Sequence, residues 1–95
     1  MEKRLLAFVT DKEHGQDFVH ADLAGVNYLI KELEYLRSEL EKNDCPHTHL
    51  FSKEWGGGEL SISTMMDRNE GMPVHHLNIY GWNDEWVDKH EFKRS

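Results

Sequence analysis

The hydrophobic and polar positions of this chain follow two periods, one typical of strands and one typical of a helix. Residues 5–9 form an apolar run after Lys3 and Arg4, which predicts a strand buried on both faces. A turn that contains Gly15 follows, and residues 18–20 form a second, brief apolar stretch. Together these segments predict a β-hairpin at the start of the chain.

Residues 23–42 carry the period of a long helix. Asp22 stands directly before them, where an aspartate side chain caps a helix, and Pro46 follows their end. Gly25 is a weak point in the first turn. The apolar residues recur at spacings of three and four and form one stripe: Leu23, Val26, Leu29, Ile30, Leu33, Leu36 and Leu40. We expect this stripe to pack against one face of a sheet, with the charged face opposite in solvent.

Strand-like alternation returns in the second half of the chain. The pattern predicts strands at 47–52, 59–64 and 74–82, separated by a glycine-rich loop at 53–58 and a turn at 67–73. Short turns favour an antiparallel meander. Residues 83–95 are charged, and their pattern leaves open a short helix and a ragged tail or edge segment.

The element order β-β-α-β-β-β predicts an α+β fold. We expect an antiparallel sheet of about five strands with one long helix packed on one face. A length of 95 residues fits one domain spanning residues 1–95, and the chain has no internal repeat, low-complexity segment or dividing linker.

Alternation along the predicted strands separates two sheet faces. Leu50, Leu77 and Ile79 suit the helix stripe. The opposite, uncovered face then carries His47, His49, Phe51, His76, Asn78, Tyr80 and Trp82. Exposed patches of this kind are typical of interfaces, in which Trp and Tyr dominate binding energy. Alternatively, these aromatic residues pack on one another under the C-terminal segment. Trp55 is a further candidate anchor, or a loop residue folded onto the sheet edge.

The charge balance bears on the kind of partner. The chain has 11 Lys and Arg against 18 Asp and Glu, a formal net charge of −7. A nucleic-acid binder would show a basic face, and none is visible, whereas an acidic protein suits a basic protein partner. The apolar run at 5–9 is too short for a signal peptide or a membrane span. With the single cysteine, Cys45, this predicts a cytoplasmic protein without membrane contact.

Seven histidines raise the question of a metal site. Imidazoles of His47 and His49, with His75 or His76, would suit zinc if their strands are neighbours. The sequence shows no spacing such as His-Glu-x-x-His, no phosphate-binding loop and no Gly-x-Ser-x-Gly elbow. The three glycines at 56–58 predict a turn with positive φ. We therefore expect no cofactor and no enzyme activity, with a small metal-binding protein or metal-dependent enzyme as the alternative.

Several short motifs in residues 22–82 occur in a recognisable order. They are Leu23-Ala24-Gly25-Val26 with Leu29 and Leu33, His47-Thr48-His49-Leu50, Glu54-Trp55-Gly56-Gly57 with Glu59-Leu60, and His76-Leu77-Asn78-Ile79-Tyr80 with Trp82. In these the chain resembles the immunity protein 32 family of bacterial polymorphic toxin systems. The resemblance covers about two-thirds of the chain.

The resemblance implies a protein that binds and neutralises a cognate toxin by occlusion or allosteric blocking. The partner-binding residues expected from the open face and the loop are His47, His49, Phe51, Trp55, His76, Tyr80 and Trp82. The toxin is expected to be basic, and the chain to be a monomer or a homodimer. A third hypothesis is a homo-oligomer whose open sheet face pairs with itself.

Overall fold

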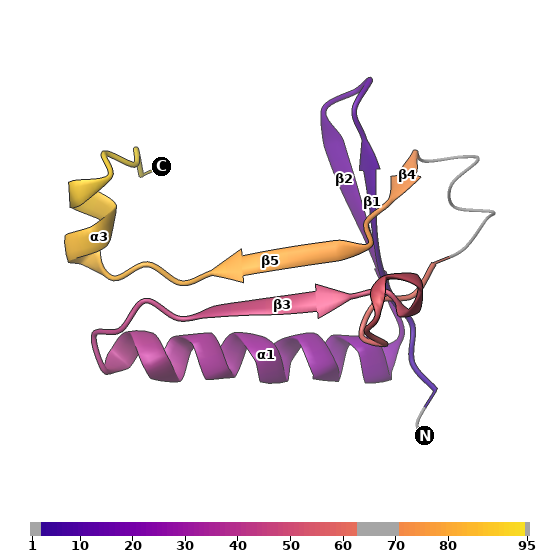
Figure 1. The fold of residues 1–95 in the computed structure, drawn as a ribbon, viewed down its shortest axis with the longest axis horizontal. Helices are drawn as coiled ribbons and strands as arrows, with labels where there is room; N and C mark the ends of the chain where they lie inside the picture. Colours follow the sequence, from indigo (N-terminus) through magenta and orange to yellow (C-terminus); the bar gives the residue numbers. More distant parts are fainter. Residues whose placement is uncertain (1–2, 63–70, 95) are drawn as a thin grey trace.

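The computed structural model describes residues 3–62 and 71–94 and shows an α+β fold (Figure 1). In chain order the elements are β1 (Leu6–Asp11), β2 (Gln16–Ala21), α1 (Leu23–Glu41), β3 (His47–Phe51), the 3-10 turn η1 (Lys53–Trp55), β4 (Met72–Pro73), β5 (His76–Tyr80) and α3 (Asp84–Lys89). The predicted hairpin is confirmed, since β1 and β2 pair antiparallel from Leu6↔Ala21 to Asp11↔Gln16.

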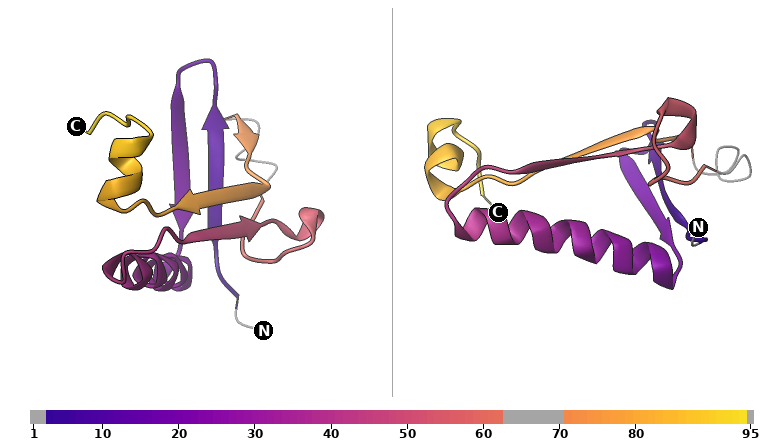
Figure 2. Two further views of the ribbon diagram at one scale, coloured as in Figure 1. Left: turned by 60° about the vertical axis from the view of Figure 1, so that its left-hand side comes forward. Right: turned by 60° about the horizontal axis from the view of Figure 1, so that its bottom comes forward.

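The five strands of the described residues form two sheets, not the single sheet that the alternation predicted. One has the order β2-β1-β4, and the other is the antiparallel pair β3-β5. The division arises inside the predicted strand 74–82. The Val74 N–H donates to Phe8 O at 2.8 Å, but the next residue, His75, accepts from the Ser52 N–H at 2.8 Å. The chain thus leaves the first sheet and joins the second within two residues, and the β1–β2 hairpin crosses β3-β5 steeply (Figure 2).

The predicted strand at 59–64 does not form over its described positions. Leu60 makes only an isolated bridge to Ser52, and it is buried as the alternation required. The Ser61 N–H donates to Leu6 O at 2.7 Å, while the Leu6 N–H donates to Ser61 Oγ at 3.2 Å. The Ser61 hydroxyl therefore accepts the hydrogen bond that a backbone carbonyl would accept in a β-sheet. The pairing does not continue beyond this point into a strand. Ser63 and Thr64 of this prediction lie outside the described residues, as do positions 67–70 of the predicted turn.

The helix α1 begins where the sequence predicted and ends at Glu41, one residue earlier than expected. Asp22 caps it, because its Oδ1 accepts from the Gly25 N–H at 2.8 Å. Hydrogen bonds from the backbone N–H groups of Leu5 and then Gly25 lower the pKa of the Asp22 carboxyl, so the cap is ionised at neutral pH. Asn43, with φ 64°, follows the helix in a left-handed conformation.

The prediction that the whole apolar stripe of α1 packs on a sheet is wrong. Leu36 is buried, and Leu29 and Leu40 are partly covered, but the other four stripe residues are exposed: Leu23, Val26, Ile30 and Leu33. The helix lies along the two-stranded sheet, where the Thr48 hydroxyl donates to Glu32 Oε2 at 3.0 Å. Two strands about 4.8 Å apart are too narrow to cover a stripe more than 100° wide.

The buried core lies where the two sheets and the helix meet. Leu6 of β1, Leu50 of β3 and Leu60 form its centre, with Tyr28 and Leu29 of α1 against them. This cluster holds together segments that are far apart in the sequence. The hairpin rises from it at one end of the β3-β5 pair, and α3 lies beyond the other end (Figure 1).

Gly25 is required by packing rather than by backbone conformation. A Cβ at this position would lie 1.8 Å from the Leu5 carbonyl oxygen, which is backbone and cannot turn aside. We therefore expect Gly25→Ala to lower the free energy of unfolding by about 1–3 kcal/mol. At an uncrowded helix position the same change would raise it by about 1 kcal/mol. Chemical denaturation measures the sign of the change in the free energy of unfolding. A stabilised Gly25→Ala variant would show that the first turn is not packed against Leu5.

Candidate partner-binding surface

The pairing register of β3 and β5 places the predicted aromatic residues of these two strands on one face, while Trp82 lies beyond the end of β5. Directly opposed pairs are His47↔Tyr80, His49↔Asn78 and Phe51↔His76. The intervening pairs, Thr48↔Ile79 and Leu50↔Leu77, point to the other face, toward α1. The separation of faces expected from alternation is therefore present in the structure.

The rings on the open face form one continuous row. From the α3 end it runs through Tyr80, His47, His49, His76 and Phe51, and we call these five residues the ring row. Successive ring centroids lie 5.9, 4.9, 5.1 and 4.1 Å apart. The last pair is stacked, with 13° between the ring planes. Such contacts hold the side chains in place before any partner arrives, which lowers the entropy lost on binding.

A hydrogen bond between two imidazoles ties the row together across the sheet. His49 Nδ1 and His76 Nε2 are 3.0 Å apart, so one nitrogen donates and the other accepts. The contact joins β3 to β5 through side chains as well as backbone. Tyr80, at the end of the row, is 58% exposed and is available to a partner.

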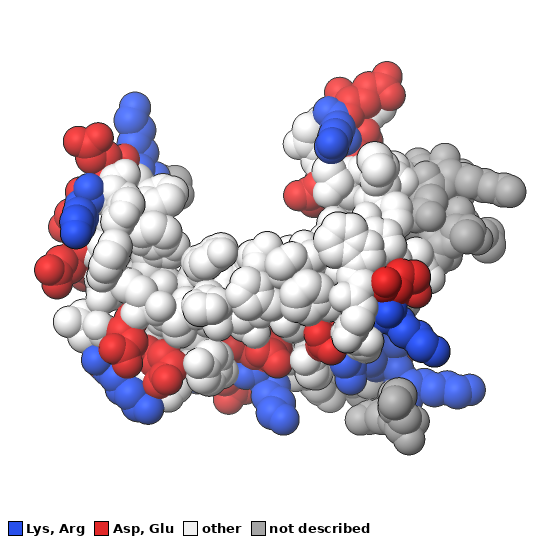
Figure 3. Space-filling model, viewed as in Figure 1, with Lys and Arg blue, Asp and Glu red and all other residues white. Residues whose placement is uncertain are grey.

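The β3-β5 pair, which carries the ring row, connects α3 with the β1–β2 hairpin (Figure 1), and we call the hollow between these two raised ends the saddle. In the space-filling view, the surface between α3 and the β1–β2 hairpin is hollowed, and its floor carries no Lys, Arg, Asp or Glu (Figure 3). Charged side chains appear on both raised ends and on the outer surface below. A neutral floor with a charged rim is the usual arrangement of a protein–protein interface.

Residues 83–95, for which the sequence left two structures open, contain the short helix α3. Asn83 caps it, because its Oδ1 accepts from the Trp86 N–H at 3.0 Å. Trp82 packs into this segment, with ring centroids 6.3 Å from Trp86 and 4.9 Å from both His90 and Phe92. The C-terminal segment thus engages Trp82 and leaves Tyr80 exposed.

Sequence reasoning missed Trp86, His90 and Phe92 as part of this surface. A signal existed, since Trp82, Trp86 and His90 are spaced by four residues around the Asn83 cap. Trp86 also stacks on His90, with centroids 5.0 Å apart. These rings form the wall at one end of the saddle.

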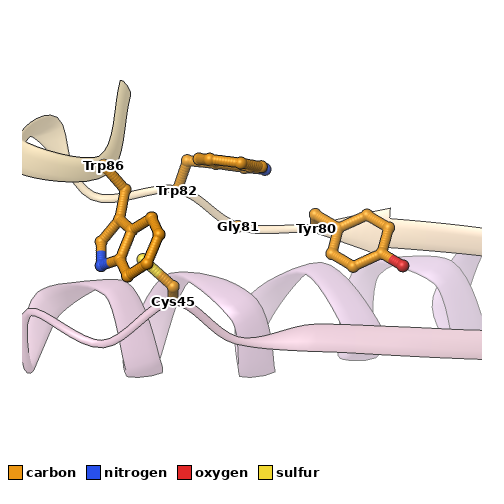
Figure 4. Close-up of a pocket in the computed structure, with 5 residues that line it drawn as sticks. All are labelled: Cys45, Tyr80, Gly81, Trp82 and Trp86. Atoms are coloured by element: carbon orange, nitrogen blue, oxygen red, sulfur yellow. The ribbon is translucent and has the colours of Figure 1, made fainter. Parts of the chain in front are cut away.

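A small pocket lies at the foot of this wall (Figure 4). It has a volume of about 170 Å³ and is lined by Cys45, Tyr80, Gly81, Trp82 and Trp86. The Trp86 ring reaches from α3 to the side of Cys45, and the Tyr80 ring lies beyond Gly81 (Figure 4). Sites for small organic ligands have about 300–1,000 Å³, so this pocket fits a single side chain of a partner.

Trp55, also predicted as a partner-binding residue, is exposed but does not join the ring row. It ends the turn η1 and stacks on His75, with centroids 5.2 Å apart. His75 Nδ1 lies 2.8 Å from the Ser52 hydroxyl, which is fully buried. A buried hydroxyl cannot meet a substrate, so this Ser–His contact is structural. Gly56 follows η1 with φ 95°, as the turn prediction required.

At the hairpin end of the saddle, Asp11 closes the β1–β2 turn. Its Oδ2 accepts from Gln16 Nε2 at 3.2 Å and lies 2.8 Å from His14 Nδ1. The side-chain hydrogen bond with His14, and then the one with Gln16, lower the pKa of the Asp11 carboxyl. This end of the saddle therefore keeps a carboxylate at neutral pH.

Within the described residues, no group of three or more His, Cys, Asp or Glu side chains could hold a metal ion. Of the alternative zinc set of His47, His49 and His76, the imidazoles of His49 and His76 bond to each other, and the His47 ring lies next to that of His49. In the same residues no helix is both long and apolar enough to cross a membrane. Comparison with protein-family models, with curated proteins and with solved structures found no match.

Proposed function

We propose that this protein is an immunity protein that binds a cognate bacterial toxin in the saddle and so blocks it. The ordered motifs that resemble the immunity protein 32 family support the role. The observation that carries the proposal is the ring row on a charge-free concave floor. Preordered aromatic residues in a depression between two raised ends are suited to hold a protruding part of another protein.

The surface indicates how such a toxin would be held. A side chain from the toxin enters the pocket beside Cys45, and the ring row packs against the surface next to it. Tyr80 lines the pocket and also ends the row. It therefore contacts both the toxin side chain in the pocket and the toxin surface next to that side chain. Residues at the centre of an interface carry most of the binding energy, and this double contact makes Tyr80 the expected anchor.

The charge distribution supports a basic toxin. The net charge of −7 creates a field that attracts a cationic protein and speeds its encounter. On the face seen in Figure 3, the acidic side chains lie on the raised ends and the outer surface below, together with Lys and Arg, while the floor stays neutral. Attraction at the rim therefore carries no cost of burying an unpaired charge at the centre.

The proposed action is stoichiometric and not enzymatic, and its proposed place is the cytoplasm of the cell that makes the toxin. A single exposed thiol, Cys45, suits that reducing compartment. A tight complex that covers or distorts the toxin needs no cofactor.

A rescue assay tests the proposal. The C-terminal domain of the large protein encoded beside this chain is expressed in a sensitive host, with and without the chain. We expect growth to stop without the chain and to resume with it, and the two proteins to co-purify in a fixed ratio. If the domain is toxic and the chain neither restores growth nor co-purifies with it, the proposed function is wrong for this pair.

A further inference from the structure

The chain exposes more surface than a compact protein of its mass. Its accessible surface is 7264 Å², whereas a folded monomer of 11.2 kDa exposes about 5,700 Å². The radius of gyration is 15.1 Å, against about 12 Å for a compact domain of this length. The excess of roughly 1,600 Å² is twice the area of about 800 Å² that each partner contributes to a standard interface. The chain therefore has exposed surface beyond that of a compact monomer, and the exposed apolar residues of α1 lie on it.

The exposed side of α1 has the pattern of a helix-pairing seam. Its apolar residues are Leu23, Val26, Ile30 and Leu33, at successive spacings of three, four and three. This is the a/d pattern of a heptad repeat, in which the side chains face a second helix. Leu23 is the most exposed large hydrophobic residue of those described, at 77%.

The same side of α1 also has a hole of the matching shape. A depression of about 240 Å³ is lined by Ile30, Leu33, Glu34 and Arg37. These positions are i, i+3, i+4 and i+7, the four residues that form a hole for a knob in coiled-coil packing. The chain therefore carries an unpaired knob, Leu23, and an unfilled hole about two to three turns further along the same helix.

We propose that α1 pairs antiparallel with α1 of a second copy of this chain, each Leu23 filling the hole of the other copy. In this register Leu23 lies opposite the partner's Leu33, and Val26 lies opposite the partner's Ile30. All four seam residues then meet an apolar residue. A two-fold axis near residue 28 relates the two copies, so the interface is isologous and closes as a dimer.

Helix dipoles support the antiparallel direction, because antiparallel helices oppose their dipoles. In the stated register Glu34 lies opposite the partner's Asp22, and Arg37 lies three residues further along, opposite position 19. The ends of the seam therefore add no charge complementarity, and the apolar contacts between the two seams carry the pairing. In a parallel pair Arg37 would face the partner's Arg37, which is repulsive.

The helix pair leaves the saddle free. In Figure 1, α1 lies on one side of β3-β5, and α3 and the hairpin rise on the other. The dimer would thus present two saddles facing outward. The inference does not depend on the proposed function, and a failed rescue assay leaves it standing.

The oligomeric state of the full chain tests the proposal. Light scattering after size-exclusion chromatography should give twice the 11.2 kDa chain mass. Leu23→Glu should raise the dissociation constant at least about 100-fold, because each dimer loses two buried leucines. This variant keeps its fold, since an acidic residue in the first turn favours a helix.

The matched control is Tyr35→Glu, which places the same charge on another face of α1 at an exposed position. It should remain a dimer. A monomeric wild-type chain at about 100 µM would overturn the proposal, and so would a dimer that survives Leu23→Glu.

Disulfide trapping tests the register. In a Cys45→Ser background, Leu23→Cys and Leu33→Cys chains are purified separately, and each is oxidised alone and after mixing. We expect the covalent dimer mainly in the mixture, where the thiol introduced into the first turn of one helix meets the thiol introduced at the far end of the other seam. Equal cross-linking of each variant with itself would indicate a parallel pair and overturn the antiparallel arrangement.

Discussion

Replacing Tyr80 by alanine is expected to weaken the complex with the toxin by roughly 30-fold to 1,000-fold, the loss typical of a central aromatic anchor. The Tyr80 ring is at once a wall of the pocket and the end of the ring row. Its removal opens the pocket and leaves His47 without its ring neighbour across the strands. Isothermal titration with the purified toxin domain measures the change.

The control for this prediction is Tyr35→Ala, which removes the same side chain from α1 at a similar exposure of 49% against 58%. It should leave toxin affinity within about twofold of the wild type. Circular dichroism and thermal unfolding show whether both variants stay folded. Equal affinities for the Tyr80→Ala and wild-type chains would place the toxin on another surface.

Replacing Leu50 by alanine is expected to lower the free energy of unfolding by about 3 kcal/mol. Leu50 is only 1% exposed, and it joins β3 to Leu6 of β1 and to Leu60. The cavity would open where the two sheets meet, in a chain with a small core. Because small domains are only marginally stable, much of the Leu50→Ala protein should be unfolded at 37 °C.

Val19→Ala serves as the comparison, since Val19 lies on β2 and is more than half exposed. Its effect should stay below about 1 kcal/mol. Urea denaturation followed by tryptophan fluorescence gives both values. A loss of less than about 1 kcal/mol for Leu50→Ala would show that the two sheets do not share a core at this position.

Features that depend on neighbouring residues were predictable from the sequence. Asp22 marks the start of α1 because its side chain caps the N–H of Gly25, three residues away. The hairpin forms around Gly15 for the same local reason, since the turn and the two strands are contiguous. The ring row was predictable as well, because alternation along one strand places every second residue on one face.

Features that depend on distant segments were not predictable. The strand expected at 74–82 divides because Val74 pairs with β1 and His75 with the segment after β3. The segment at 59–62 forms no strand because Ser61 bonds to Leu6, more than fifty residues away. Periodicity shows which side chains share a face, but it does not show which strand lies alongside.

Within α1, some features are determined by the amino-acid sequence and others by the tertiary structure. Its start, its length to within one residue and the apolar residues of its stripe follow from the amino-acid sequence alone. Which half of that stripe is buried depends on the fold, because the width of the sheet beside the helix is set by pairing between distant strands. In the same way, the residues of the ring row follow from local alternation, whereas long-range packing sets the row between two raised ends.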